Sequence, residues 1–191
     1  YRAALNLAGF SAGVALPALQ ASGPTVTPAV IDFINGNDGT GAARSARLGP
    51  LINTVASIVA RPVPYEQLPP LTGSHSAFEE LHKDRKPLIW IGSNDGMLHA
   101  FDFDSGVEVL ALFPPQLLSS QVTLYDNFVD ADRKGTGQPD NFTNIYGVAG
   151  SLRFGDVFFP PPNAGYRTVG FMTLAGGGDL LAAIDITHPF P

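Results

Sequence analysis

The sequence predicts a mainly β fold, and three observations support this prediction. Glycine and proline are abundant, with 21 and 17 residues among 191, and both residue types divide a chain into short strands joined by turns. Hydrophobic residues make up 45% of the chain, which is enough to form a sizeable core. Between Leu88 and Phe113, three short apolar runs are separated by tight turns, and such a meander is the unit of a β-propeller blade.

This meander is the strongest local pattern in the chain. We expect the runs 88–91 and 97–101 to pair as antiparallel strands, with a third strand over 107–113 after the turn 103–106. The turn between the first two strands contains Asn94, Asp95 and Gly96. Asparagine, aspartate and glycine are the residues that a tight turn requires, so a structural role is favoured over a catalytic or metal-binding one.

A similar unit follows near the end of the sequence, with expected strands over 166–174 and 179–185. Asp102 and Asp185 occupy corresponding places at strand ends, where each carboxylate is expected to accept N–H bonds from the next residues. A blade needs about 40 to 50 residues, so two blades or one blade with a long insertion would explain their spacing. We expect the insertion, over Leu118–Pro162, because this span has few strand-like runs.

The remaining segments have weaker patterns. The stretch 3–19 could form an apolar helix or an ordered loop, and we expect a helix that ends before Pro17. We expect a second helix over 28–36, because Pro28 suits a helix N-terminus and Asn35-Gly36 ends the apolar periodicity. Residues 48–59 are expected to form a strand, 61–76 an irregular surface segment, and 77–83 a helical turn. The predicted organisation is an apolar segment or linker over 1–29, followed by one domain over 30–191.

The sequence lacks the features that are typical of several classes of protein. The formal net charge is −6 and the basic residues are scattered, so nucleic-acid binding is not predicted. There is no cysteine, and this chain has neither an apolar run of membrane-spanning length nor the basic region followed by an apolar core that is typical of a signal peptide. The four histidines have no metal-site spacing, and the alternation around His99 predicts a hydrogen-bonded packing residue. Neither a nucleophile elbow nor a phosphate loop is present.

One segment begins like a calcium loop. Asp130 and Asp132 stand at its first and third positions and Gly135 at its sixth. Lys134 occupies the fifth position and Asn141 the twelfth, where calcium loops supply oxygen ligands and a bidentate carboxylate. We therefore expect a solvent-exposed loop with weak calcium affinity, whose candidate metal ligands are Asp130, Asp132 and Asp140.

The stretch from Ile89 to Phe113 resembles the signature of the PilY/PilC family of type IV pilus-tip proteins, most specifically over Gly92–Asp102. Flanking stretches that are similar to the same family, in the same order, are Phe33–Gly36, Arg47–Gly49, Tyr125–Asp130 and Tyr166–Pro189. The sequence departs from the family at Leu48-Gly49-Pro50, where a Leu-Gly-Asp stretch is expected. The resemblance covers about residues 30 to 189.

This resemblance implies a modified, seven-bladed β-propeller with quinoprotein-like blades, of which the chain would be the first part, with long loop insertions and a few short helices. It also implies a non-enzymatic module, exported through the periplasm to the pilus tip at the cell surface, that supports pilus biogenesis and adhesion. The implied partners are minor pilins and a host or surface receptor. No cofactor is expected within this chain, although the full-length protein could bind calcium. Two alternatives remain, a quinone-dependent dehydrogenase-like enzyme and a periplasmic scaffold propeller.

Overall fold

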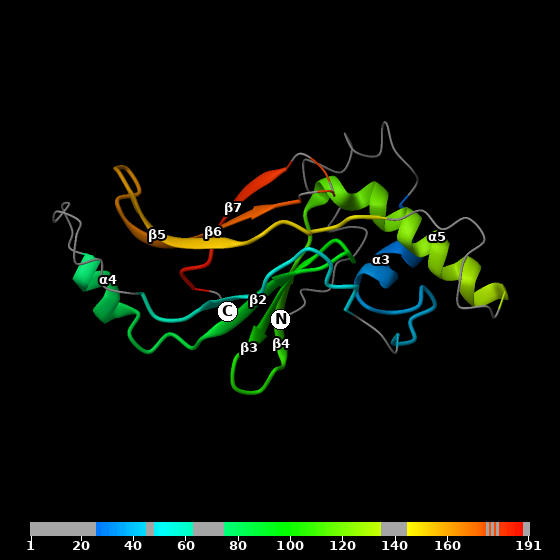
Figure 1. Cartoon of the computed structure of the whole chain (residues 1–191), viewed down its shortest axis with the longest axis horizontal. Coiled ribbons are helices and arrows are strands. Elements are labelled where there is room, and N and C mark those ends of the chain that lie inside the picture. The colour runs from blue at the N-terminus through cyan, green and yellow to red at the C-terminus, as the bar shows by residue number, and fades with distance from the viewer. Residues whose placement is uncertain are drawn as a thin grey trace.

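The computed structural model describes residues 26–44, 48–62, 75–134, 145–174, 176, 178 and 180–188. Two antiparallel sheets form the centre, and helices lie toward both ends of the molecule (Figure 1). This arrangement agrees with the predicted mainly β class. No closed sheet is formed by the described residues.

The first sheet contains the predicted meander and one additional strand. Its order is β1 (Ser57–Val59), β2 (Leu88–Gly92), β3 (Leu98–Asp102) and β4 (Glu108–Leu112). The expected pairing of β2 with β3 is confirmed, with a register that runs from Leu88 opposite Asp102 to Gly92 opposite Leu98. The strand expected over 48–59 is much shorter, since only β1 pairs with β2 and residues 48–56 lie outside the sheet.

The second sheet has the order β5 (Arg153–Phe159), β6 (Gly165–Thr173) and β7 (Leu181–Asp185). The strands β6 and β7 confirm the strands expected near the end of the chain. Asp102 and Asp185 therefore lie in different sheets, so the two meander-like stretches of the sequence belong to two separate sheets. The expectation of one blade with a long insertion is wrong, because β5 lies within the supposed insertion and pairs along its whole length with β6.

The main hydrophobic core joins the two sheets. Leu88, Trp90 and Leu98 from the first sheet are nearly inaccessible to water, and they pack in one cluster with Met172 of β6. The segment 148–152, which precedes β5, supplies Val148 and Leu152 to the same cluster. Sequence alternation places these side chains on one face of each strand, so burying them holds the sheets together.

A second, smaller core joins two helices to the first sheet. Helix α3 (Pro28–Ile34) begins at Thr27, whose Oγ1 accepts a hydrogen bond from the Val30 N–H at 3.3 Å, and it confirms the predicted helix with proline in its first turn. Helix α5 (Leu118–Lys134) lies beside α3 (Figure 1) and follows the short 3₁₀ helix η1 (Pro115–Leu117). The side chains buried between these elements include Val30, Ile34, Met97, Leu118 and Val122.

Helix α5 corrects two expectations. The span 118–162 was expected to be loop, but Leu118, Val122 and Tyr125 repeat at a helical spacing and contact the second core. The calcium-like segment was also expected to be loop from residue 130, yet the helix continues to Lys134. A helical backbone cannot wrap around a cation as a calcium loop does, so residues 130–134 do not form such a loop.

The remaining expectations divide between described and undescribed residues. Helix α4 (His75–Leu81) confirms the helical turn expected over 77–83, with Phe78 as its buried residue, but it begins at His75, so the last two residues of the expected irregular segment are helical. The helix expected within 3–19 and residues 63–74 of the irregular segment lie outside the described residues. Among the residues that the structure describes, no helix is long and apolar enough to cross a membrane.

Candidate functional site

The candidate site is the turn between β2 and β3, which lies within the stretch Gly92–Asp102 that resembles the family signature. The Ser93 N–H donates to the Met97 carbonyl at 3.0 Å, and the Gly96 N–H donates to the Ser93 carbonyl at 3.1 Å. Gly96 has a φ of +86°, a conformation that glycine adopts without steric cost. Ser93 and Asn94 are both buried, so this turn does not project into solvent.

Asn94 connects the turn to two distant segments of the chain. Its backbone N–H donates to the Pro50 carbonyl at 3.1 Å. Its side-chain Oδ1 accepts from the Gly147 N–H at 3.2 Å. The adjacent Val148 N–H donates to the Ser93 carbonyl at 3.0 Å, which strengthens the second connection. The turn is thereby held between the segment before β1 and the segment before β5.

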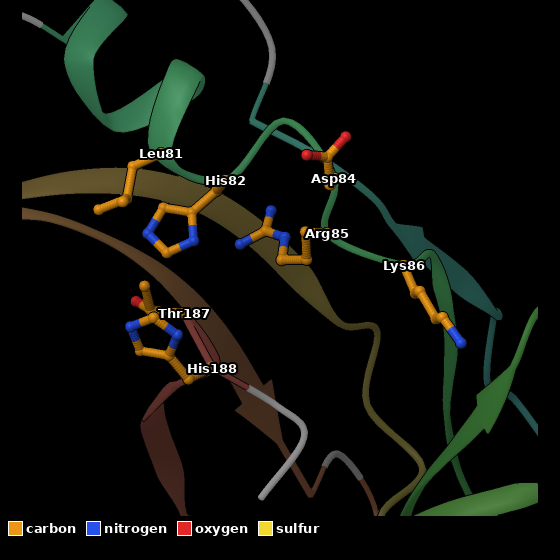
Figure 2. A pocket seen from close by; sticks show the side chains of 7 residues that line it. All are labelled: Leu81, His82, Asp84, Arg85, Lys86, Thr187 and His188. Carbon is orange, nitrogen blue, oxygen red and sulfur yellow. The ribbon is translucent and has the colours of Figure 1, made fainter.

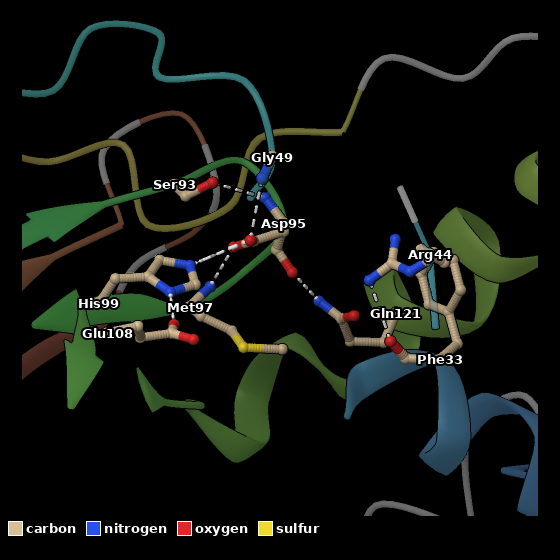
Figure 3. Close-up of polar contacts among 9 residues, drawn as sticks. All are labelled: Phe33, Arg44, Gly49, Ser93, Asp95, Met97, His99, Glu108 and Gln121. Carbon is tan, nitrogen blue, oxygen red and sulfur yellow. Dashed lines mark hydrogen bonds and ion pairs between the residues drawn. The ribbon is translucent and has the colours of Figure 1, made fainter. Parts of the chain in front are cut away.

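Asp95 also connects the turn to distant segments, through its carboxylate and its backbone carbonyl (Figure 3). Its Oδ2 accepts from the Gly49 N–H and its Oδ1 from the Met97 N–H, both at 3.0 Å. Its backbone carbonyl accepts a hydrogen bond from Nε2 of Gln121 in α5. Three distant segments of the chain, namely residues 49–50, helix α5 and residues 147–148, therefore meet at this turn.

A buried imidazole completes this cluster (Figure 3). His99 of β3 is 1% exposed, and its Nε2 lies 3.0 Å from Asp95 Oδ2 while its Nδ1 lies 2.6 Å from Glu108 Oε1. Burial by itself would lower the pKa of His99, but hydrogen bonds and charge from Asp95 and Glu108 outweigh that effect and raise the pKa to about 9. The imidazole is therefore protonated at neutral pH and donates to both carboxylates, which confirms the predicted hydrogen-bonded packing role.

The cluster contains serine, histidine and aspartate, but its geometry differs from that of a nucleophilic triad. Such a triad needs one imidazole nitrogen free to accept the serine proton. Both nitrogens of His99 face carboxylates, and Ser93 Oγ accepts from the Asp95 N–H at 3.3 Å. The arrangement joins the β2–β3 turn, β3 and β4 through charge-assisted hydrogen bonds of His99 and joins α5 through the neutral Gln121 bond, and it does not present a base to a substrate.

The aspartates at the strand ends have local partners. Asp102 Oδ1 accepts from the Ser105 N–H at 2.8 Å and from Ser105 Oγ at 2.7 Å. Asp185 Oδ1 accepts from the Thr187 N–H at 3.0 Å, and its Oδ2 faces Arg167 Nη1 at 2.8 Å. These bonds lower the pKa of both carboxyl groups, against the opposing effect of burial, which is the largest single influence at Asp185.

The structure does not bring the candidate metal ligands together as a described site. The backbones of Asp130 and Asp132 belong to α5, while Asp140 lies outside the described residues. No cluster of three or more histidine, aspartate or glutamate side chains suited to a metal ion occurs among the described residues.

Sequence reasoning missed the partners of the turn, which are Gly49, Pro50, Gln121 and Gly147, and the partner of His99, which is Glu108. Glu108 was detectable in principle, because His99 and Glu108 lie on the adjacent strands of the predicted meander. Gln121 and Gly147 had no such signal, since their contacts with the turn depend on where α5 and the segment before β5 pack.

Comparison with known proteins finds relatives of this chain by sequence. No family model matches the chain. The chain is 33% identical over 149 residues to type IV pilus biogenesis factor PilY1 of Pseudomonas aeruginosa, and 32% identical over 116 residues to a PilY1 homologue of Xylella fastidiosa. These matches cover 76% and 61% of the chain, but 12% and 8% of the relatives' own lengths.

A solved structure is also similar to the chain. The crystal structure of the Pseudomonas aeruginosa PilY1 C-terminal domain shares 30% sequence identity with it, over 69% of this chain and 23% of that domain, with a TM-score of 0.43. The assignment depends on the shared sequence and not on this superposition. The chain belongs to the PilY1 family.

Proposed function

We propose that this chain is a non-enzymatic module of a type IV pilus-tip protein that supports pilus biogenesis and surface adhesion. The observation that carries the proposal is the stretch Gly92–Asp102, which resembles the family signature and whose turn is hydrogen-bonded to three distant segments of the chain. The relatives are named type IV pilus biogenesis factors, which supports the same role here. The chain spans about a tenth of their length, so it would contribute to that role as one part of a larger protein.

The chemistry of the turn supports a non-enzymatic module. A catalytic histidine needs a pKa near the working pH and access to a substrate. His99 has neither, because it is buried, its pKa is raised to about 9 and two carboxylates occupy its nitrogens. Its proposed role is to hold the strands in register. Quinone-stimulated alcohol oxidation by the purified full-length protein would contradict this part of the proposal.

We further propose that the two sheets are successive blades of a modified β-propeller. Propeller blades are antiparallel meanders that pack face to face around a central axis. Both sheets are antiparallel meanders, and one hydrophobic cluster containing Trp90 and Met172 lies between them. Further blades would then come from parts of the full-length protein outside this chain.

Exposed apolar side chains before and within β1 support a place inside a larger assembly. Leu51 and Val55, which precede β1, and Ile58, within β1, are 47%, 63% and 61% exposed, and β1 is an edge strand of the first sheet. Exposed apolar patches at a sheet edge are typical of surfaces that contact other protein. In the proposed setting the partners are other blades, minor pilins or a surface receptor, and the protein is exported through the periplasm to the pilus tip.

A genetic experiment tests this proposal. The gene that encodes the full-length protein is deleted in its own bacterium, and surface pilin is measured in sheared fractions by immunoblot. We expect surface pili to be lost while intracellular pilin remains, with recovery after complementation by the intact gene and none by a gene that lacks residues 26–188. Adhesion, normalised to surface pilin, is measured in the same strains. Unchanged pili and unchanged adhesion in the deletion strain would refute the proposal.

A further inference from the structure

A pocket of about 510 Å³ lies on a different part of the molecule from the signature turn (Figure 2). Its walls come from the end of α4, the segment that leads into β2, and the residues after β7. The lining residues are Leu81, His82, Asp84, Arg85, Lys86, Thr187 and His188. Residues about a hundred positions apart in the sequence therefore form one concave surface.

Two imidazoles face each other in this pocket (Figure 2). The ring centroids of His82 and His188 are 5.0 Å apart. His82 is only 8% exposed, and its other face packs against Phe78 with ring centroids 4.6 Å apart. Neither imidazole makes a hydrogen bond with the part of the chain that the structure describes. Both imidazoles line the pocket, where each can offer a ring nitrogen to a bound molecule.

Arg85 supplies a fixed positive charge beside these rings (Figure 2). Its Nε and Nη2 donate to the Ala60 carbonyl, and its Nη1 donates to Thr168 Oγ1 at 2.7 Å. These bonds use three of the five guanidinium N–H groups and hold the plane in place, so two N–H groups remain for another partner. Because the donor geometry is fixed before binding, little conformational entropy would be lost on contact with an acceptor.

The nearest buried carboxylate is already engaged. Asp156 Oδ1 accepts from Thr168 Oγ1 at 2.7 Å, and its Oδ2 lies 3.0 Å from His75 Nε2. It influences Arg85 by charge and not by a direct hydrogen bond. On the pocket wall itself, the carboxylate of Asp84 points away from the two imidazoles (Figure 2). The interior of the pocket therefore offers donors and positive charge.

We propose that this pocket binds an anionic group, a carboxylate or a tetrahedral oxyanion, between Arg85 and the imidazoles of His82 and His188. Arginine donates in a planar fork that suits carboxylates and phosphates, and a neighbouring imidazole adds a donor. A metal ion fits less well, because the fixed guanidinium repels a cation and no cluster of three metal-ligating side chains occurs among the described residues.

Binding should be stronger at lower pH. Burial lowers the pKa of His82, and the charges of His188 and Arg85 lower it further, whereas Asp156 opposes them. Lys86 and Asp84 are the other charged groups on the pocket wall. The imidazole is largely neutral at pH 7 without a ligand, and an anion beside it would favour the protonated form. By linkage, protonation must then strengthen anion binding.

Calorimetric titration of the full-length protein with inorganic phosphate tests the proposal at pH 6 and pH 8. Sulfate and acetate titrations then distinguish a tetrahedral oxyanion from a carboxylate. The variants are His82→Phe, which keeps an aromatic ring between Phe78 and His188, and His188→Gln. Lys83→Gln is the matched control, because Lys83 is exposed, pairs with Glu80 and does not line the pocket.

We expect at least one of the three anions to bind, with about tenfold weaker affinity in each histidine variant, unchanged affinity in Lys83→Gln and tighter binding at pH 6. Thermal unfolding verifies that each variant is folded, and His188→Gln decides the result if His82→Phe does not fold. Three outcomes would overturn the proposal: no anion binding, equal weakening by Lys83→Gln, or zinc binding that depends on both histidines in a protein that binds none of the anions.

Discussion

Replacing His99 by glutamine tests the central claim that a protonated imidazole ties the signature turn to the first sheet. The substitution removes a positive charge from between Asp95 and Glu108, which lie 3.0 and 2.6 Å from the ring nitrogens. Removing one partner of a buried charge pair costs about 3 to 5 kcal/mol. The Glu108 side chain is 25% exposed and can turn toward water, so we expect the lower end of that range.

The raised pKa leads to a similar magnitude by an independent route. A change from 6.5 to about 9 corresponds to about 3 kcal/mol, since each tenfold change in proton affinity is about 1.4 kcal/mol. Because the folded state binds this proton more tightly than the unfolded state, the stabilisation is complete below pH 6.5. It is lost progressively as the pH rises through about 9.

Urea unfolding of the full-length protein between pH 6.5 and 9.5 measures both effects. At pH 6.5 we expect His99→Gln to lower the free energy of unfolding by about 3 kcal/mol in the transition that includes this chain. Between pH 6.5 and pH 9.5 this free energy should fall much less in the variant than in the wild type. The exposed His188, replaced by glutamine, is the control for loss of a histidine. A loss below about 1 kcal/mol with an unchanged pH profile would refute the charge-pair reasoning.

Two further predictions concern packing and metal binding. Gly92→Ala should destabilise the protein by about 1 to 3 kcal/mol, because the new methyl group would overlap the Val148 backbone carbonyl and lie 2.8 Å from Val148 Cγ1. Gly155→Ala in β5 is the control, because its methyl group would meet no atom within 4 Å and should be tolerated. Thermal unfolding compares the two variants, and equal losses would contradict the predicted close approach of the segments. Calcium titration should give the same affinity for wild type and Asp130→Ala, because residues 130–134 continue α5 and do not wrap around a cation. A micromolar affinity that Asp130→Ala abolishes would show that this region does form a site.

Local patterns predicted the elements whose partners are close in sequence. The meander 88–112 was predictable because alternating apolar residues and the Asn94-Asp95-Gly96 turn both favour the same hairpin. Helix α3 was predictable because Pro28 and Asn35-Gly36 mark its two ends. Helix α5 was not predicted, because the apolar repeat of Leu118, Val122 and Tyr125 is short and is followed by polar residues with the spacing of a calcium loop, which favour a loop.

The sequence by itself determined the mainly β class, the family and the turn at the centre of the signature. The tertiary structure alone decided what that turn does, since Gly49, Gln121 and Gly147 reach it from segments 26 to 53 residues away. It also decided that His82 and His188 share one pocket. The physical reason is that hydrophobic burial between the two sheets sets these distances, and burial depends on apolar area and shape without specifying which distant polar groups will meet.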